Sequence, residues 1–310
     1  IGFHLTQRLK RDGYWVRGVD IKAPEYEPTD ADQFWDDCDL RVPQNCTDAC
    51  DGIDTVFNLA ADMGGIGYIT AHLATIARNN VLIGMNMLEE ARAAGVKRFL
   101  FSSSACVYPQ SLQQFPDVTP LKEEDAWPAD PEKGYGLEKL FTEEMCRYYA
   151  EDFGMETRIV RFHNVMGPLG SWRGGREKSP AAICRKVAEA KDGGEIEVWG
   201  DGRQTRSYMY VDDCVEGLIR LMASDYREPL NLGTDRLVTI NELVDIVAKI
   251  AGKKIGKRHD LTKPQGVRGR NSDNSRIWKV LGWGPTITLE DGLARTYPWI
   301  EQQVKAAADK

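Results

Sequence analysis

The chain has 310 residues, a length that suggests two domains or one large α/β unit with an appended lobe. Hydrophobic residues make up 42% of the chain and charged residues 28%, and there is no run of 18 apolar residues, so a disordered chain and a membrane-spanning helix are excluded. The net charge of -7 is spread along the sequence, which argues against a nucleic-acid or membrane partner. We therefore expect a cytoplasmic protein.

The cysteine pattern favours reduced thiols. There are seven cysteines, an odd number with irregular spacing, in a chain long enough to fold without disulfides. Cys46 and Cys50 resemble half of a metal site, but no second cysteine pair follows and the four histidines do not fall at ligand spacing. We expect no metal.

The first element predicted is an amphipathic helix, because apolar residues recur at positions 1, 5 and 9, and it should end near residue 12. A strand-like run over 14–20 then ends on Asp20, 18 residues after Gly2. In a dinucleotide-binding βαβ unit, a glycine-rich turn opens the first helix and a carboxylate about 20 residues further on binds the adenosine ribose. On this interpretation Gly2 is the third glycine of that turn and the first strand precedes Ile1. The alternative, that Asp20 only ends a surface strand, fits this spacing equally well.

Strand and helix patterns alternate further along, with a strand at 54–61, a helix at 74–94 and a strand at 98–104. This alternation predicts a parallel sheet covered by helices on both faces, with ligands at the carboxyl ends of the strands. Residues expected to contact the dinucleotide there are Asp39, Leu59 and Ala60.

The alternation becomes irregular after Asn164, with loops rich in Gly and Arg. We therefore expect a dinucleotide-binding domain over 1–165 and a substrate-binding lobe that makes up most of 166–310. The chain should return to the first domain at about 206–235.

Tyr135 and Lys139 stand four residues apart, on one face of a helix predicted to run to about Tyr149. A nearby ammonium favours phenolate, so Lys139 is expected to lower the pKa of Tyr135, which would then accept a proton from a sugar hydroxyl. Ser104, at the end of a strand, would assist. The alternative is a solvated helix face.

Five strings resemble the extended short-chain dehydrogenase/reductases that act on nucleotide sugars, and the match runs nearly end to end. The strings are 58–65 (NLAADMGG), 103–109 (SSACVYP), 135–139 (YGLEK), 174–178 (GGREK) and 266–274 (GVRGRNSDN). The resemblance implies a Rossmann-type, doubly wound parallel sheet with a smaller C-terminal lobe, bound NAD and a homodimer. It also implies that Lys139 reaches the nicotinamide ribose.

Within that family, the strings around Cys106, Lys178 and Arg268 are most similar to enzymes that epimerise GDP-mannose at carbons 3 and 5. The resemblance implies a transient 4-keto intermediate and the products GDP-L-galactose and GDP-L-gulose. Other 4-epimerases and 4,6-dehydratases remain alternatives within the family, although the acid pair of the dehydratases is missing at Ala105 and Cys106. A non-catalytic NAD-binding sensor is the alternative from another class.

The resemblance assigns the two proton-exchange roles to Cys106 and Lys178. A Cys106 thiolate stabilised by cations would remove protons beside the ketone, and Lys178, after the flexible 174–175 pair, would act on the opposite face. The alternatives are a small buried thiol for Cys106 and an exposed lysine at a helix start for Lys178. Ser179 stands where the family pattern has Ala, which is expected to alter only local hydrogen bonding.

Basic residues of the lobe suit a sugar diphosphate, because guanidinium groups bind phosphate oxygens with two parallel hydrogen bonds. Arg270 fits either this role or an ordinary surface charge. Asp212 and Asp213 are read as a helix N-cap without a catalytic role. The resemblance places the following residues at the substrate, in addition to Ser104, Cys106 and Lys178: Gly64, Gly65, Ala105, Asn164, Glu177, Lys186, Gln204, Thr205, Arg206 and Arg268.

Overall fold

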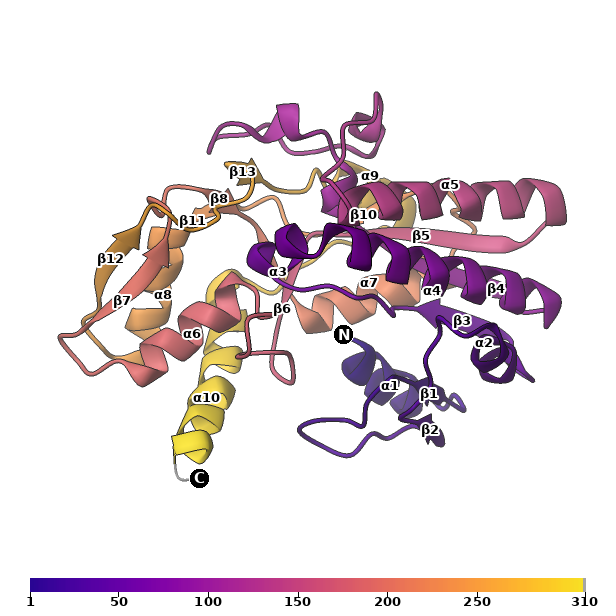
Figure 1. Ribbon diagram of the computed structural model, residues 1–310, viewed down its shortest axis with the longest axis horizontal. Helices are drawn as coiled ribbons and strands as arrows, with labels where there is room; N and C mark the ends of the chain where they lie inside the picture. The colour runs from indigo at the N-terminus through magenta and orange to yellow at the C-terminus, as the bar shows by residue number, and fades with distance from the viewer. Residues whose placement is uncertain (309–310) are drawn as a thin grey trace.

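The structure is a computed structural model that describes residues 1–308. Its larger part is built on a four-stranded parallel sheet, with helices on both faces (Figure 1). The strand order is β10-β5-β4-β3, so the chain crosses over between neighbouring strands. The strands are β3 (Thr55–Asn58), β4 (Arg98–Ser104), β5 (Glu156–Phe162) and β10 (Leu230–Leu232).

Side chains of the central strands alternate between two hydrophobic cores. Phe99, Phe101 and Ile159 pack on one face, and Leu100 and Val160 pack on the other, as the two-residue period of a strand requires. The first core is covered by α2 (Pro43–Cys50), α4 (Leu73–Ala93) and α5 (Tyr135–Phe153), and the second by α1 (Gly2–Arg11), α7 (Val211–Ala223) and α9 (Ser275–Leu281). The predicted fold class is therefore confirmed.

The N-terminal elements form a small sheet of their own, in which β1 (Arg17–Val19) pairs in parallel with β2 (Gln33–Trp35). The first helix ends where the sequence predicted, with Asp12 as its C-cap. The strand expected over 14–20 is shorter, because Tyr14 and Trp15 are exposed and make no ladder contacts. α3 (Ile66–Ala71) was not predicted.

A smaller lobe lies to the left of the sheet in Figure 1 and has a separate core that includes Ile183, Val198, Val244 and Leu293. The boundary predicted near residue 165 falls within the strand β6 (Asn164–Met166). The elements of the lobe and its connections are β6 (Asn164–Met166), α6 (Ser179–Glu189), β7 (Glu195–Trp199), β8 (Thr205–Arg206), β9 (Tyr208–Tyr210), β11 (Val238–Thr239), α8 (Ile240–Ala251), β12 (Gly256–Asp260), β13 (Gly269–Arg270) and α10 (Leu289–Ala308).

After the first part of the lobe, the chain packs on the sheet again through α7 and β10. The N-cap reading of Asp212 and Asp213 is wrong, because Tyr210 caps α7. Asp213 instead accepts hydrogen bonds from the backbone amides of Thr286 and Ile287, at 2.9 and 2.8 Å. None of the described helices combines the length and apolar character needed to cross a bilayer.

Candidate active site

The site begins at the carboxyl end of β4, where Ser104 ends the strand and caps a short 3-10 helix, η1 (Ala105–Val107). The Ser104 hydroxyl accepts a hydrogen bond from the backbone amide of Cys106 at 3.2 Å. This turn buries Cys106, which keeps 8% of its surface exposed. The strand end therefore presents a hydroxyl and a thiol from neighbouring positions.

The start of α5 packs directly on this turn. The amide of Glu132 donates to the carbonyl of Cys106 at 3.0 Å, and Gly134 caps α5 with a φ of 74°, a conformation that favours glycine. At Gly136, a side chain would collide with the carbonyl of Cys106. These contacts explain the local sequence and bring Tyr135 beside Cys106 and Ser104.

Lys139 lies one turn further along α5 and is buried, as the i and i+4 spacing predicted for its side of the helix. Its ammonium lies 4.8 Å from the ring centre of Phe101 and 5.6 Å from that of Tyr135. It is also 3.9 Å from a carboxylate oxygen of Glu138. The solvated-face alternative is excluded for this pair.

The pKa of Tyr135 moves in the direction opposite to the one predicted. Burial raises the pKa of Tyr135 above its usual range, the charges of Cys106 and Glu138 add to the rise, and a hydrogen bond with Ser104 opposes it. Burial likewise lowers the pKa of Lys139. Desolvation is the largest influence on both groups, because both charged forms are removed from water.

Cys106 has a cationic partner, Arg270, which the sequence analysis assigned only to the substrate-binding lobe. Arg270 Nη1 donates to Cys106 Sγ at 3.3 Å, and Arg270 is itself buried, so the reading of Arg270 as ordinary surface charge is wrong. Burial raises the pKa of the Cys106 thiol, and the charge of Arg270 opposes this rise. The expected cation is therefore present, but desolvation is the larger influence.

Lys178 is the N-cap of α6 and belongs to the same cluster. It is half-buried rather than exposed. Burial lowers its pKa, while the charge of Cys106 raises it and that of Arg270 lowers it, which places the three groups within electrostatic reach. The next residue, Ser179, bonds the hydroxyl of Tyr208 at 2.7 Å, so the departure from Ala does alter local bonding.

The loop before Lys178 is attached to the glycine pair at 64–65. The amide of Gly65 donates to the carbonyl of Arg176 at 3.1 Å, and a side chain at Gly65 would meet the carbonyl of Glu177 at 2.7 Å. The guanidinium of Arg176 lies 4.1 Å from the ring centre of Tyr68. The glycine therefore permits a close approach between two loops.

Several residues expected at the substrate are held by protein contacts in the lobe. Glu177 pairs with Arg185 at 3.2 Å, and Arg268 pairs with Asp201 at 3.0 Å. Further contacts join Lys186 to the carbonyl of Glu197 at 2.8 Å, Gln204 to that of Trp199 at 3.0 Å, Asn164 to that of Ser207 at 3.1 Å, and Thr205 to that of Pro116.

Arg206 is the most deeply desolvated of the expected phosphate ligands. Burial lowers its pKa to about 10, and the charge of Arg270 acts in the same direction. The half-buried Arg206 and the buried Arg270 form no ion pair with a carboxylate of residues 1–308, which favours an anionic ligand because each guanidinium group then gains a counter-charge. Gln204 Oε1 and Arg270 Nη2 are buried and have no hydrogen-bond partner among the described residues.

The residues expected to bind the dinucleotide line the carboxyl edge of the sheets. Asp20 follows β1, its Oδ1 accepts a hydrogen bond from the backbone amide of Lys22 at 3.3 Å, and it forms no ion pair among the described residues, so its other oxygen is available to the diol of a ribose. Gly2 opens α1 close to Leu59, which, with Ala60, follows β3. Asn58 is buried there with neither side-chain amide atom hydrogen-bonded within the described chain. These groups fit NAD.

Asp39 differs from the other cofactor candidates, because its carboxylate is already bound by Arg41. Arg41 Nη2 lies 2.6 Å from Asp39 Oδ2, and hydrogen bonds from Arg41 lower the pKa of Asp39. Only a ligand that also contacts Arg41 would use this pair.

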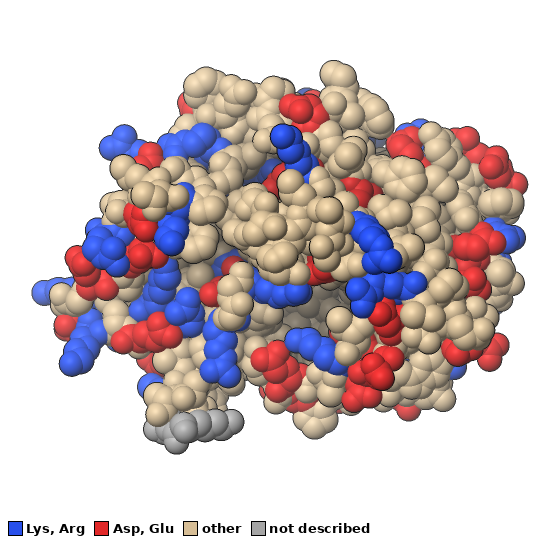
Figure 2. Space-filling model, viewed as in Figure 1, with Lys and Arg blue, Asp and Glu red and all other residues tan. Residues whose placement is uncertain are grey.

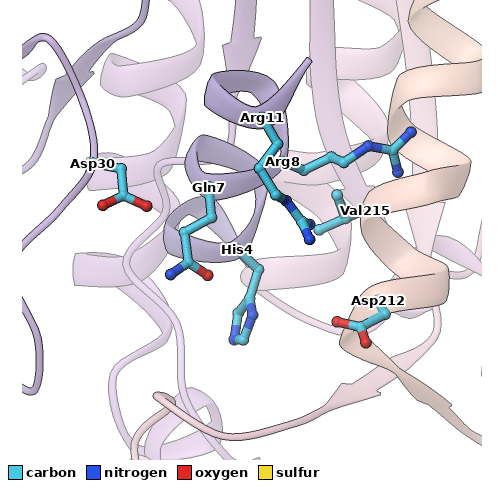
Figure 3. Close-up of a pocket in the computed structure, with 7 residues that line it drawn as sticks. All are labelled: His4, Gln7, Arg8, Arg11, Asp30, Asp212 and Val215. Atoms are coloured by element: carbon cyan, nitrogen blue, oxygen red, sulfur yellow. The ribbon is translucent and has the colours of Figure 1, made fainter. Parts of the chain in front are cut away.

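Basic side chains and hollows are distributed unevenly over the surface. Figure 2 shows basic side chains over the smaller lobe, around α6 and β12, and around a hollow that borders the larger part. A separate pocket of about 420 Å³ lies between α1 and α7 (Figure 3). Its charged lining includes Arg8 and Arg11 on one side and Asp30 and Asp212 on others, and it contains none of the predicted site residues.

A parallel sheet with Ser104, Tyr135 and Lys139 at its carboxyl edge defines a nicotinamide-dependent enzyme of the short-chain dehydrogenase/reductase class. Residues 1–233 match the family described as the NAD dependent epimerase/dehydratase family, and the chain belongs to it.

Individual relatives are similar over almost the whole chain. The chain is 50% identical over 308 residues to GDP-mannose 3,5-epimerase 1 of Oryza sativa subsp. japonica and to GDP-mannose 3,5-epimerase of Arabidopsis thaliana, covering 98% of this chain and 80% of each relative. The crystal structure of a Thermotoga maritima UDP-glucose 4-epimerase with UDP-glucose is 26% identical, with a TM-score of 0.83 over 98% of this chain and 96% of that one. The resemblance inferred from the sequence strings is confirmed.

Proposed function

We propose that this protein catalyses the NAD-dependent epimerisation of GDP-mannose at carbons 3 and 5, giving GDP-L-galactose and GDP-L-gulose. The observation that carries the proposal is the meeting of Cys106, Arg270 and Lys178 beside Tyr135, in a chain that is 50% identical to two GDP-mannose 3,5-epimerases. The two halves of the chemistry then fall to two sets of side chains.

The first set handles the hydroxyl at carbon 4. NAD, when bound, supplies the acceptor for the two electrons that leave carbon 4. Tyr135 accepts the hydroxyl proton, Ser104 donates a hydrogen bond at the same oxygen, and Lys139 supplies the positive charge that stabilises a phenolate. Burial raises the pKa of Tyr135, so the phenolate that accepts this proton is the less populated form, and the positive charge of Lys139 favours it.

The second set exchanges the protons beside the resulting ketone. Cys106 removes a proton on one face, aided by Arg270, whose positive charge favours the thiolate. Lys178 delivers a proton on the opposite face, and burial lowers its pKa toward the range in which an amine exchanges protons readily. Reduction of carbon 4 then restores the cofactor, so the cycle is redox-neutral.

Both the lobe and the larger part supply binding groups. Arg206 and Arg268 bind the diphosphate, Lys186, Gln204, Thr205 and Asn164 line the nucleotide side, and Gly64, Gly65, Ala105 and Glu177 shape the hexose site. Buried cations in a protein of net charge -7 support this assignment, because they concentrate positive potential where a diphosphate would lie.

The finer points of assembly and location belong to the same proposal. We propose a homodimer, because α5 exposes Leu137, Phe141 and Tyr148, a set of large apolar side chains that a partner subunit would cover. Sedimentation should give twice the chain mass, and Phe141→Asp should give a monomer.

Seven free cysteines support a reducing compartment, the cytoplasm.

The test is incubation with GDP-mannose in heavy water. Epimerisation at carbons 3 and 5 should incorporate carbon-bound deuterium and yield both new sugars, whereas a 4-epimerase would invert carbon 4 without solvent exchange and a dehydratase would lose water. Tyr135→Phe should abolish product formation and the absorbance of the reduced nicotinamide. Absence of deuterium in the sugar with the wild-type protein would refute the proposal.

A further inference from the structure

Glu138 is a deeply buried carboxylate beside the candidate active site that the reaction outlined above does not use. It lies on α5 between Tyr135 and Lys139 and is 3% exposed. One oxygen, Oε1, accepts a hydrogen bond from Asn80 at 2.8 Å. The other, Oε2, is buried without a hydrogen-bond partner among the described residues. An unsatisfied buried carboxylate is costly, so a compensating role is expected.

The charge of Glu138 acts mainly on Lys139. The two groups lie 3.9 Å apart, both side chains are 2% exposed, and no other carboxylate of the described chain forms an ion pair with Lys139. The ammonium also lies near the aromatic faces of Phe101 and Tyr135. At this separation and burial, loss of the carboxylate charge would remove the main electrostatic support for the ammonium.

Glu138 is also joined to a loop of the site through Asn80. The Asn80 amide group donates to the carbonyl of Asp62 at 3.0 Å, and its oxygen accepts from the backbone amide of Asp62 at 2.6 Å. The Asp62 carboxylate in turn accepts from the Tyr68 hydroxyl at 2.9 Å and pairs with Arg176 at 3.4 Å. A single amide therefore connects the Tyr135–Lys139 helix to both loops next to Lys178.

The pKa of Glu138 lies close to neutral pH. Burial raises its pKa to about 7, and the charge of Lys139 and the hydrogen bond from Asn80 oppose the rise. Burial lowers the pKa of Lys139, while Glu138, then Cys146 and Glu143, raise it. These groups on α5, with Asn80 from α4, are the charged or polar neighbours that face Glu138.

We propose that Glu138 is a positioning residue for the Tyr135–Lys139 pair, whose carboxylate holds Lys139 as an ammonium and whose protonation releases it. The expected effect of Glu138 on turnover rests on the proposed function. The expected effect of Glu138 on the ionisation of Lys139 does not. It adds to the reaction a residue that touches neither substrate nor cofactor.

The first experiment measures Lys139 directly and needs no activity. Lysine side chains labelled with ¹⁵N are titrated by NMR in the wild type and in Glu138→Gln, with the Lys139 signal assigned from Lys139→Arg. Glutamine keeps the size and the acceptor for Asn80 but removes the charge. The titration midpoint of Lys139 should fall by at least about one pH unit, a tenfold change in the ratio of ammonium to amine. An unchanged midpoint in folded protein overturns the proposal.

The second experiment measures the pH profile of kcat with GDP-mannose. The wild type should lose activity as pH falls through about 7, where Glu138 becomes protonated. Glu138→Gln should lack this limb and have a kcat at least about tenfold lower above it, with KM within twofold. Asn80→Ala, which keeps the charge but removes an interaction that lowers the pKa of Glu138, should move the limb to higher pH.

A merely structural role gives a different result. Both variants would then lower the melting temperature and scale the whole profile without moving its midpoint, and this outcome overturns the proposal. If no variant or wild type turns over GDP-mannose, the proposed function fails, while the NMR midpoint of Lys139 still decides the role of Glu138.

Discussion

Cys106→Ser should separate proton exchange from oxidation in this enzyme. Serine preserves the size of the side chain in a turn where Cys106 is 8% exposed, and Ser104 can still accept the backbone amide of residue 106. A hydroxyl is a far weaker acid than a thiol, so residue 106 can no longer ionise beside Arg270. The variant therefore removes a base and leaves Tyr135 and Lys139 in place.

The size of the effect follows from the geometry. Arg270 Nη1 and Cys106 Sγ are 3.3 Å apart, which at an effective dielectric constant of about 20 gives an attraction of roughly 5 kcal/mol for a thiolate. This attraction opposes the desolvation that raises the pKa of Cys106 and keeps the thiolate accessible. Loss of a general base costs about 10²–10⁴-fold in rate, so exchange should fall by that factor.

The assay follows deuterium incorporation from heavy water by mass spectrometry and the absorbance of bound NADH after addition of GDP-mannose. Exchange should collapse in Cys106→Ser, while the NADH signal persists. Cys184→Ser is the matched control, because Cys184 is also buried but lies in the core of the smaller lobe, and the exchange rate of this variant should stay at the wild-type value. Wild-type exchange in Cys106→Ser would show that Cys106 is a packing residue and would make Lys178 the first candidate base.

Three further predictions concern binding and stability. Asp20→Asn should weaken NAD binding about 10–100-fold and reduce discrimination against NADP, measured by calorimetry, because a charged acceptor for the ribose is lost. Glu143→Gln should lower the free energy of unfolding in urea by about 3–5 kcal/mol, because Arg161, 2.6 Å away and buried, loses its counter-charge. Glu138 has a pKa raised from 4.5 to about 7, so its stabilising effect is complete below pH 4.5 and is lost as pH rises through 7. As pH rises across this range, the free energy of unfolding of Glu138→Gln should therefore increase by about 3 kcal/mol relative to that of the wild type. Urea unfolding at several pH values measures this, and a difference between the two proteins that does not change with pH would contradict the reasoning.

The sequence by itself determined several helices and strands and which site residues share a helix face. Apolar periodicity predicted α1, and the apolar run at 98–104 coincides with β4. Helix spacing placed Tyr135 and Lys139 on one side of α5. These are local properties, because the period of a helix or strand fixes which side chains share a face before any tertiary contact forms.

Only the tertiary structure decided the charges and partners in the site. Arg270 contacts Cys106 across 164 residues of chain, and Glu138 meets Asn80 of another helix. The one sequence signal was the Asn79–Asn80 pair on the otherwise apolar buried side of α4, which indicates a hydrogen-bonded partner without naming it. The pKa of Tyr135 reversed its predicted direction because desolvation depends on everything that excludes water from a group, and the order of residues along the chain does not contain that quantity.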